Sequence, residues 1–202
     1  MKLAFGLSAW VGLALLASPS FAADPIGKVD RVQGESLGMV GDATQPLAPE
    51  TPVFLNEAVS TGADGRLALT FQDGTMLTLG EKAKVSIDEF VYQPAGANRL
   101  RMSVSGAFRY ISGKLAPGGM HDAMVTTPYA VIGVRGTDFW GGAIDGRFGV
   151  VVLEGAVTVT TPGGSFDLDS ANVGVDLGGG SVNVENWPED KRARALATVN
   201  FR

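Results

Sequence analysis

Hydrophobic and polar residues alternate with a period of two along most of the chain. The pattern is clearest in four segments, residues 67–71, 77–79, 85–87 and 100–104. Successive side chains of a β-strand point to opposite faces, so this alternation predicts strands with one buried face. No helical period separates these segments, which favours a protein built of sheets.

Short turn sequences lie between the predicted strands. The Asp-Gly pairs at 64–65, 73–74 and 145–146 tolerate the positive φ angles of tight turns, and we assign 154–155 and 162–164 to turns as well. Short strands joined by tight turns predict an all-β fold. We expect either a single antiparallel sandwich or a rolled, β-helix-like domain.

The C-terminal tail, residues 186–202, has a different pattern. Pro188 is followed by two acidic and then several basic residues, which predicts a short helix over 188–199. Its apolar face is thin, so we expect a cap that lies on the sheet through Trp187 and Leu196. The alternative is a segment that binds a partner or a membrane surface.

The N-terminus has the features of a cleavable export signal. Lys2 precedes an apolar stretch, residues 3–17, and small residues follow at the expected cleavage position after Ala22. The stretch is shorter than the roughly 20 apolar residues that a spanning helix needs. We therefore predict a signal peptide over 1–22, an all-β domain over 23–185, and no transmembrane segment in the mature chain.

Charge and composition restrict the function further. Removal of residues 1–22 leaves 21 acidic against 15 basic residues, a net charge of −6, and the chain has no cysteine. An acidic chain without a basic face argues against nucleic-acid binding. The lack of cysteine excludes disulfides, thiolate metal sites and thiol catalysis.

One segment, residues 130–140 (AVIGVRGTDFW), combines glycine and arginine with an apolar run. A regular strand here has mixed faces, so we predict a break near Gly136. Arg135 is then expected at a strand junction, where it donates to loop carbonyls or pairs with the carboxylate of Asp138 or Glu154. With such a structural role, Arg135→Ala is expected to lower the melting temperature. In the alternative, Arg135 is exposed and binds an anionic partner.

The sequence offers little support for catalysis. His121 is the only histidine, and no Gly-x-Ser-x-Gly pattern is present, so we predict neither a Ser-His-Asp site nor a histidine-based zinc site. Five carboxylates could supply a glycosidase pair: Asp88, Glu89, Asp122, Asp138 and Glu154. We favour a structural interpretation, with Asp88 and Glu89 at the polar end of a strand and Glu154 in a turn. We predict no catalytic residue, cofactor or metal.

Aromatic residues leave a second binding function open. Six of them are candidates for a sugar-binding face: Tyr92, Phe108, Tyr110, Tyr129, Phe139 and Trp140. Such residues are more often anchors of the core, with any hydroxyl or indole N–H at its rim, and we favour that interpretation.

Several separated motifs lie in a distinctive order. They are Gly27-Lys28-Val29, residues 60–69, 73–79, 106–108, 125–128, 134–139 and 152–157. In this order and spacing the chain resembles the periplasmic domain of the FecR family over residues 26–160. The resemblance implies an all-β envelope domain without catalysis, in which the following motif residues have structural roles: Asp73, Gly74, Gly133, Arg135, Gly136, Thr137, Glu154 and Gly155.

The resemblance also implies a function. In the best-known members, this domain follows a cytoplasmic anti-sigma segment and one transmembrane helix, and it relays a signal from an outer-membrane receptor to a sigma factor. Here only the predicted signal peptide precedes Ala23. We therefore expect a periplasmic or secreted module that senses a signal or binds another envelope protein, with carbohydrate or cell-wall binding as the alternative.

Overall fold

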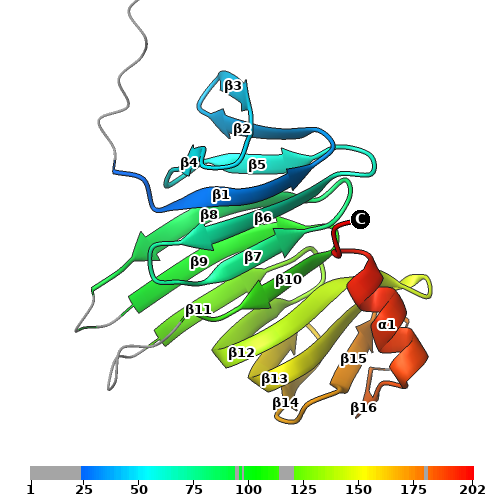
Figure 1. The fold of residues 1–202 in the computed structure, drawn as a ribbon. Helices are drawn as coiled ribbons and strands as arrows, with labels where there is room; N and C mark the ends of the chain where they lie inside the picture. The colour runs from blue at the N-terminus through cyan, green and yellow to red at the C-terminus, as the bar shows by residue number, and fades with distance from the viewer. Residues whose placement is uncertain (1–23, 94–95, 97, 114–120, 180–181) are drawn as a thin grey trace, which may run out of the picture.

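A computed structural model describes residues 24–93, 96, 98–113, 121–179 and 182–202. The predicted signal peptide lies outside the described residues. Within these residues, sixteen strands form one continuous sheet that curls onto itself, and a single helix follows (Figure 1). The all-β fold and the short C-terminal helix are as predicted, and the sheet is rolled, which is one of the two architectures expected from the sequence.

The first eight strands are β1 (Gly27–Gln33), β2 (Ser36–Val40), β3 (Ala43–Pro46), β4 (Pro52–Val53), β5 (Ala58–Thr61), β6 (Arg66–Phe71), β7 (Met76–Leu79) and β8 (Lys84–Val91). The remaining strands are β9 (Asn98–Ser105), β10 (Phe108–Ile111), β11 (His121–Thr126), β12 (Val131–Ile144), β13 (Arg147–Thr161), β14 (Gly164–Leu168), β15 (Val173–Leu177) and β16 (Asn183–Asn186). The helix is α1 (Glu189–Ala197).

The curled sheet has two layers. The first runs in the order β4-β1-β6-β7-β10-β12-β13-β15-β16, and the second in the order β3-β2-β5-β8-β9-β11-β12-β13-β14. Strands β9 and β11 pair in parallel, and the other described pairs are antiparallel. The sheet is therefore mixed, whereas the sequence suggested an antiparallel one.

The long hairpin of β12 and β13 belongs to both layers. Residues 131–134 of β12 pair with β11, and residues 138–141 pair with β10. Between them the register with β13 shifts, and Gly136 and Gly155 have φ angles of +60° and +84°. The break expected near Gly136 is thus a β-bulge inside one strand. Gly155 lies opposite it within β13, so the turn expected at 154–155 is not formed.

The core lies between the layers. In β6, Leu67, Leu69 and Phe71 are buried, as their alternation predicts. Phe71 stacks on Phe90 of β8 with ring centroids 5.9 Å apart, which joins the first layer to the second. The turn at Asp145 and Gly146 has positive φ at both residues and connects β12 to β13 as predicted.

Helix α1 covers the outer face of the first layer. Trp140 and Trp187 are buried beneath it, and the indole nitrogen of Trp140 donates to Thr198 Oγ1 at 3.0 Å. Lys191 lies 3.9 Å from the centre of the Trp187 ring and 2.6 Å from Asp176. The tail is a packed cap, and the described part of the chain has no helix long and apolar enough to cross a bilayer.

Candidate functional site

The Asp73-Gly74 motif forms the turn between β6 and β7. The two carboxylate oxygens of Asp73 accept hydrogen bonds from the backbone N–H and the hydroxyl of Thr75, both at 2.9 Å. Gly74 has a φ of +81°, a conformation that glycine adopts without strain. Thr75 Oγ1 also accepts a hydrogen bond from Gly113 N at 3.2 Å, which joins the turn to the segment after β10.

Thr137 occupies the bulge of β12 and is almost fully buried. Its hydroxyl donates to Ala156 O at 2.5 Å and accepts from Ala156 N at 3.3 Å. Its backbone N–H donates to Ser112 Oγ at 2.9 Å. One residue therefore bonds β12 both to β13 and to the segment after β10.

Tyr110 joins these two groups of motif residues. Its side chain is fully buried, and its hydroxyl hydrogen-bonds with Thr75 and Ser112. Burial raises the pKa of the phenol above its ordinary value. Motif residues that are far apart in the sequence thus form one buried polar network. That they stabilise the fold remains a prediction, which a substitution in the bulge tests.

The structure places Arg135 differently from our expectation. Its side chain is exposed, and no hydrogen bond or ion pair holds it within the described residues. Asp138 instead binds Arg109, with Nε–Oδ1 and Nη2–Oδ2 distances of 2.9 and 2.6 Å. Asp138 follows the bulge, where β12 pairs with β10, and so meets Arg109. Glu154 is exposed, and Gly133 lies in the regular part of β12.

The carboxylates considered for catalysis are held by different neighbours. Asp88 accepts bonds from two serine hydroxyls. Arg99 lies between Glu89 and Asp122, at 3.0 and 3.4 Å. The hydrogen bond from Arg101 lowers the pKa of Asp122, which is opposite to the change that a general acid needs. The side chain of His121 lies outside the described residues.

The aromatic residues do not form a sugar-binding face. Four of the six candidates are fully buried in the core: Phe108, Tyr110, Phe139 and Trp140. Tyr92 and Tyr129 are exposed, and Tyr129 stacks on Phe148 at 4.8 Å. The structure therefore gives no support to the carbohydrate-binding alternative.

The free edges of the sheet lie at opposite ends of the molecule (Figure 1). At one end, β3 and β4 are short and carry Pro46 and Pro52. Proline has no N–H to donate, so it blunts an edge against further pairing. At the other end, β14 and β16 contain no proline. The two ends therefore differ in their capacity to accept another strand.

The register of β14 shows which backbone groups are available. Thr161 and Gly164 form the pair next to the turn, where the two residues exchange hydrogen bonds. Pairs alternate along an antiparallel ladder, so the N–H and C=O groups of Ser165 and Asp167 point away from β13. Among the described strands, β14 pairs with β13 alone. Its outer edge thus presents two donors and two acceptors.

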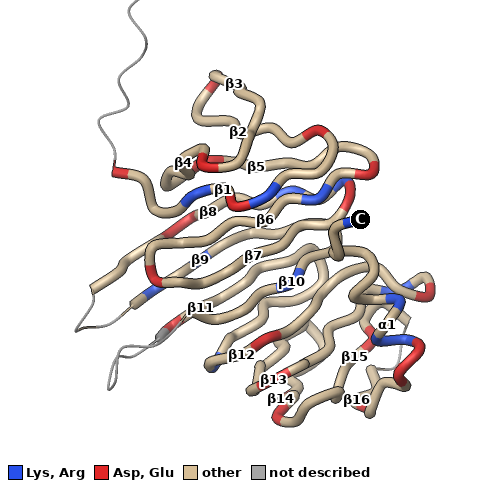
Figure 2. The backbone as a smooth tube through the Cα atoms, in the orientation of Figure 1, with Lys and Arg blue, Asp and Glu red and all other residues tan. Residues whose placement is uncertain are grey.

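Strand β16 offers a similar edge, because Trp187 N donates to Asn172 O and thereby sets its register. The outward groups are those of Val184 and Asn186. Acidic positions accompany both edge strands (Figure 2). Asp167 and Asp169 are exposed beside β14. This end of the molecule is therefore an open, acidic sheet edge.

The fold is similar to that of solved proteins. Two crystal structures of a candidate anti-sigma factor from Parabacteroides distasonis match with TM-scores of 0.57 and 0.55, at 20% and 19% identity. Both matches cover 69% of this chain, which spans only 63% and 64% of those chains. No curated protein sequence matches significantly. The profile of the family described as FecR protein matches residues 57–158, half of the sequence. The chain belongs to the FecR family.

Proposed function

We propose that the protein is a non-catalytic regulatory module of the cell envelope that binds another envelope protein through strand β14. Membership of the FecR family and the fold shared with a candidate anti-sigma factor support a regulatory, signal-sensing role. The predicted signal peptide over residues 1–22 supports a periplasmic location.

The observation that carries this proposal is the open edge of β14. An extended segment of the partner adds to the sheet by bonding to the outward N–H and C=O groups of Ser165 and Asp167. The edges at the opposite end carry prolines, so addition is directed to this end. Exposed Asp167 and Asp169 favour a partner strand that carries lysine or arginine.

The position of this edge bears on specificity. The family match ends at residue 158, before β14 begins. The proposed contact surface therefore lies on a part of the chain beyond the matched region. The family match therefore carries no expectation about the partner of β14.

The test uses one substitution and a matched control. Ser165→Pro removes an outward N–H that the domain itself does not use, whereas Ser165→Ala keeps it. Both variants lose the contact of the Ser165 hydroxyl with Thr160. We expect in-cell crosslinking of the tagged protein to capture one envelope protein with the wild type and with Ser165→Ala, and to lose it with Ser165→Pro. The melting temperature of Ser165→Pro should equal that of Ser165→Ala.

Regulation is tested by comparing transcripts. Deletion of the gene and the Ser165→Pro variant should change the same transcripts, and Ser165→Ala should change none. Capture of the same protein by Ser165→Pro would exclude β14 as the contact. Retention of wall glycan alone, with no protein enriched, would overturn the proposed function.

A further inference from the structure

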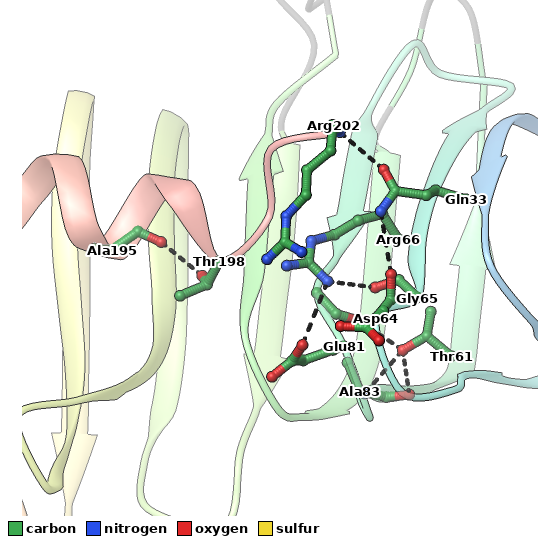
Figure 3. A network of polar contacts seen from close by, with 11 residues as sticks. Gln33, Thr61, Asp64, Gly65, Arg66, Glu81, Ala83, Ala195, Thr198 and Arg202 are labelled. Atoms are coloured by element: carbon green, nitrogen blue, oxygen red, sulfur yellow. Dashed lines mark hydrogen bonds and ion pairs between the residues drawn. The ribbon is translucent and has the colours of Figure 1, made fainter.

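A pocket of about 510 Å³ lies between the C-terminal tail and the strand ends and turns around Arg66, Gly106 and Ala143. Four basic residues line it, Arg66, Lys82, Arg194 and Arg202, together with one acidic residue, Glu81. Arg66 comes from β6 and Arg202 from the tail, and Figure 3 shows both side chains directed into the same space. The pocket therefore carries an excess of positive charge.

Arg66 is the buried member of this group, with 2% of its side chain exposed. Its Nη1 donates to Gly65 O at 2.7 Å, but its buried Nε has no hydrogen-bond partner among the described residues. The nearest carboxylate oxygen, on the half-exposed side chain of Glu81, lies 3.9 Å from Nη1. A buried guanidinium with an unused donor is costly unless an acceptor reaches it.

The other basic residues of the pocket are not neutralised equally. Arg194 is bound by Asp145, with a second contact to Asp190 at 3.6 Å. Lys82 and Arg202 have exposed side chains that form no ion pair within the described part of the chain. Together with Arg66 they give the pocket three cationic side chains, against one acidic side chain among its lining residues, Glu81.

The carbonyl groups at the end of α1 do not balance this charge. Ala195 O accepts bonds from the N–H and the hydroxyl of Thr198. Leu196 O accepts bonds from Val199 N and Asn200 N. These acceptors are already used within the tail, so they are not available to the unused donor of Arg66.

We propose that this pocket binds an oxyanion, the carboxylate or phosphate group of a small ligand, with Arg66 as its buried anchor. A guanidinium presents paired N–H donors that match such a group, and Lys82 and Arg202 add charge from the rim. The pocket volume is in the range of small-molecule sites. A bound oxyanion links the sheet to the tail. The site is distinct from β14 and goes beyond the proposed partner binding.

The test measures the melting temperature of residues 23–202 in sodium phosphate and in sodium malonate. Sodium chloride at equal ionic strength is the reference. A ligand that binds only the folded state stabilises it increasingly with concentration. We expect at least one of the two oxyanions to raise the melting temperature beyond the chloride reference. A response to one of them identifies the phosphate or the carboxylate source.

Exposed positions allow a test that does not depend on the buried arginine. The double variant Lys82→Gln/Arg202→Gln should raise the anion concentration that gives half the maximal shift by about tenfold. The matched control, Lys84→Gln/Arg147→Gln, changes two exposed cations outside the pocket and should leave it unchanged. Hydrogen exchange of residues 198–202 should slow when the anion is bound.

Two results would overturn the site. One is a shift no larger than that in chloride for both oxyanions, and the other is an equal response in the two double variants. The Ser165→Pro variant separates this inference from the proposed function, because it should lose its protein partner and keep its response to the anion.

Discussion

The carboxyl group of Glu57 is buried beside Gly38 and Leu47. One oxygen accepts a bond from Phe54 N at 2.9 Å, and the other has no hydrogen-bond partner among the described residues. Burial raises the pKa of this group above its ordinary value of 4.5. The protonated form therefore favours the folded state, and this stabilisation is lost as the pH rises through the folded pKa.

This predicts a pH-dependent difference between the wild type and Glu57→Gln. Glutamine cannot ionise, so the unfolding free energy of the wild type should fall relative to that of Glu57→Gln as the pH rises above 4.5. Urea unfolding at several pH values measures it. Glu154→Gln, at an exposed glutamate, is the control. Parallel pH profiles for the wild type and Glu57→Gln would contradict the prediction.

The two arginines near Asp138 should differ in their effect on stability. Arg135→Ala removes an exposed side chain and should change the unfolding free energy by less than about 0.5 kcal/mol. Arg109→Ala leaves the largely buried Asp138 without its two hydrogen bonds, and should cost roughly 1–3 kcal/mol. Thermal unfolding of the two variants measures which arginine contributes more to stability. A larger loss for Arg135→Ala would return the structural role to that residue.

Single residues were predictable from the sequence where the period of two is unbroken. Leu67 and Leu69 were assigned to the buried face on that basis, and they are buried. Arg135 was misplaced because the bulge beside it changes which neighbours its side chain meets. Arg109 occupies a polar position between two buried aromatic residues, and that alternation was the available signal for its role.

At the bulge, Gly136 of β12 and Gly155 of β13 lie opposite each other. Gly155 has a positive φ, and a Cβ atom there lies only 2.3 Å from Gly136 O. Gly136 also has a positive φ, but a Cβ atom there has open space around it. We expect Gly136→Ala to cost about 1 kcal/mol and Gly155→Ala about 3 kcal/mol or more.

Thermal and urea unfolding of the two glycine variants measure this difference. The same measurements test whether the bulge stabilises the fold together with the buried network around Thr137, whose hydroxyl bonds across this bulge. Equal losses for the two substitutions would show that crowding in the bulge is unimportant, and negligible losses for both would argue against a structural role for the motif.

At the level of elements, local patterns predicted more than long-range pairing. The helix predicted over 188–199 is observed at Glu189–Ala197. The parallel pairing of β9 with β11 was not predicted, because alternation fixes which face is buried and not which strands are neighbours. The open edge of β14 was missed for the same reason, since it depends on a register that only the assembled sheet defines.

The molecule as a whole should unfold in one step. Strands β12 and β13 each contribute residues to both layers, so neither layer keeps its pairing if the hairpin is lost. In urea, the fluorescence of Trp140 and Trp187 and the far-ultraviolet circular dichroism should change with the same midpoint. Distinct midpoints would indicate that the layers unfold separately.

The unequal ends of the sheet limit how far pairing between molecules can extend. Once a strand occupies β14, the edges at the far end of the same molecule carry Pro46 and Pro52, which lack the backbone N–H that a further strand needs. Two copies that meet through their open edges form a closed pair related by a two-fold axis, with blunted edges facing outward. Pairing through β14 therefore stops at a single added partner, and β16 is then the edge without proline that remains at this end among the described strands.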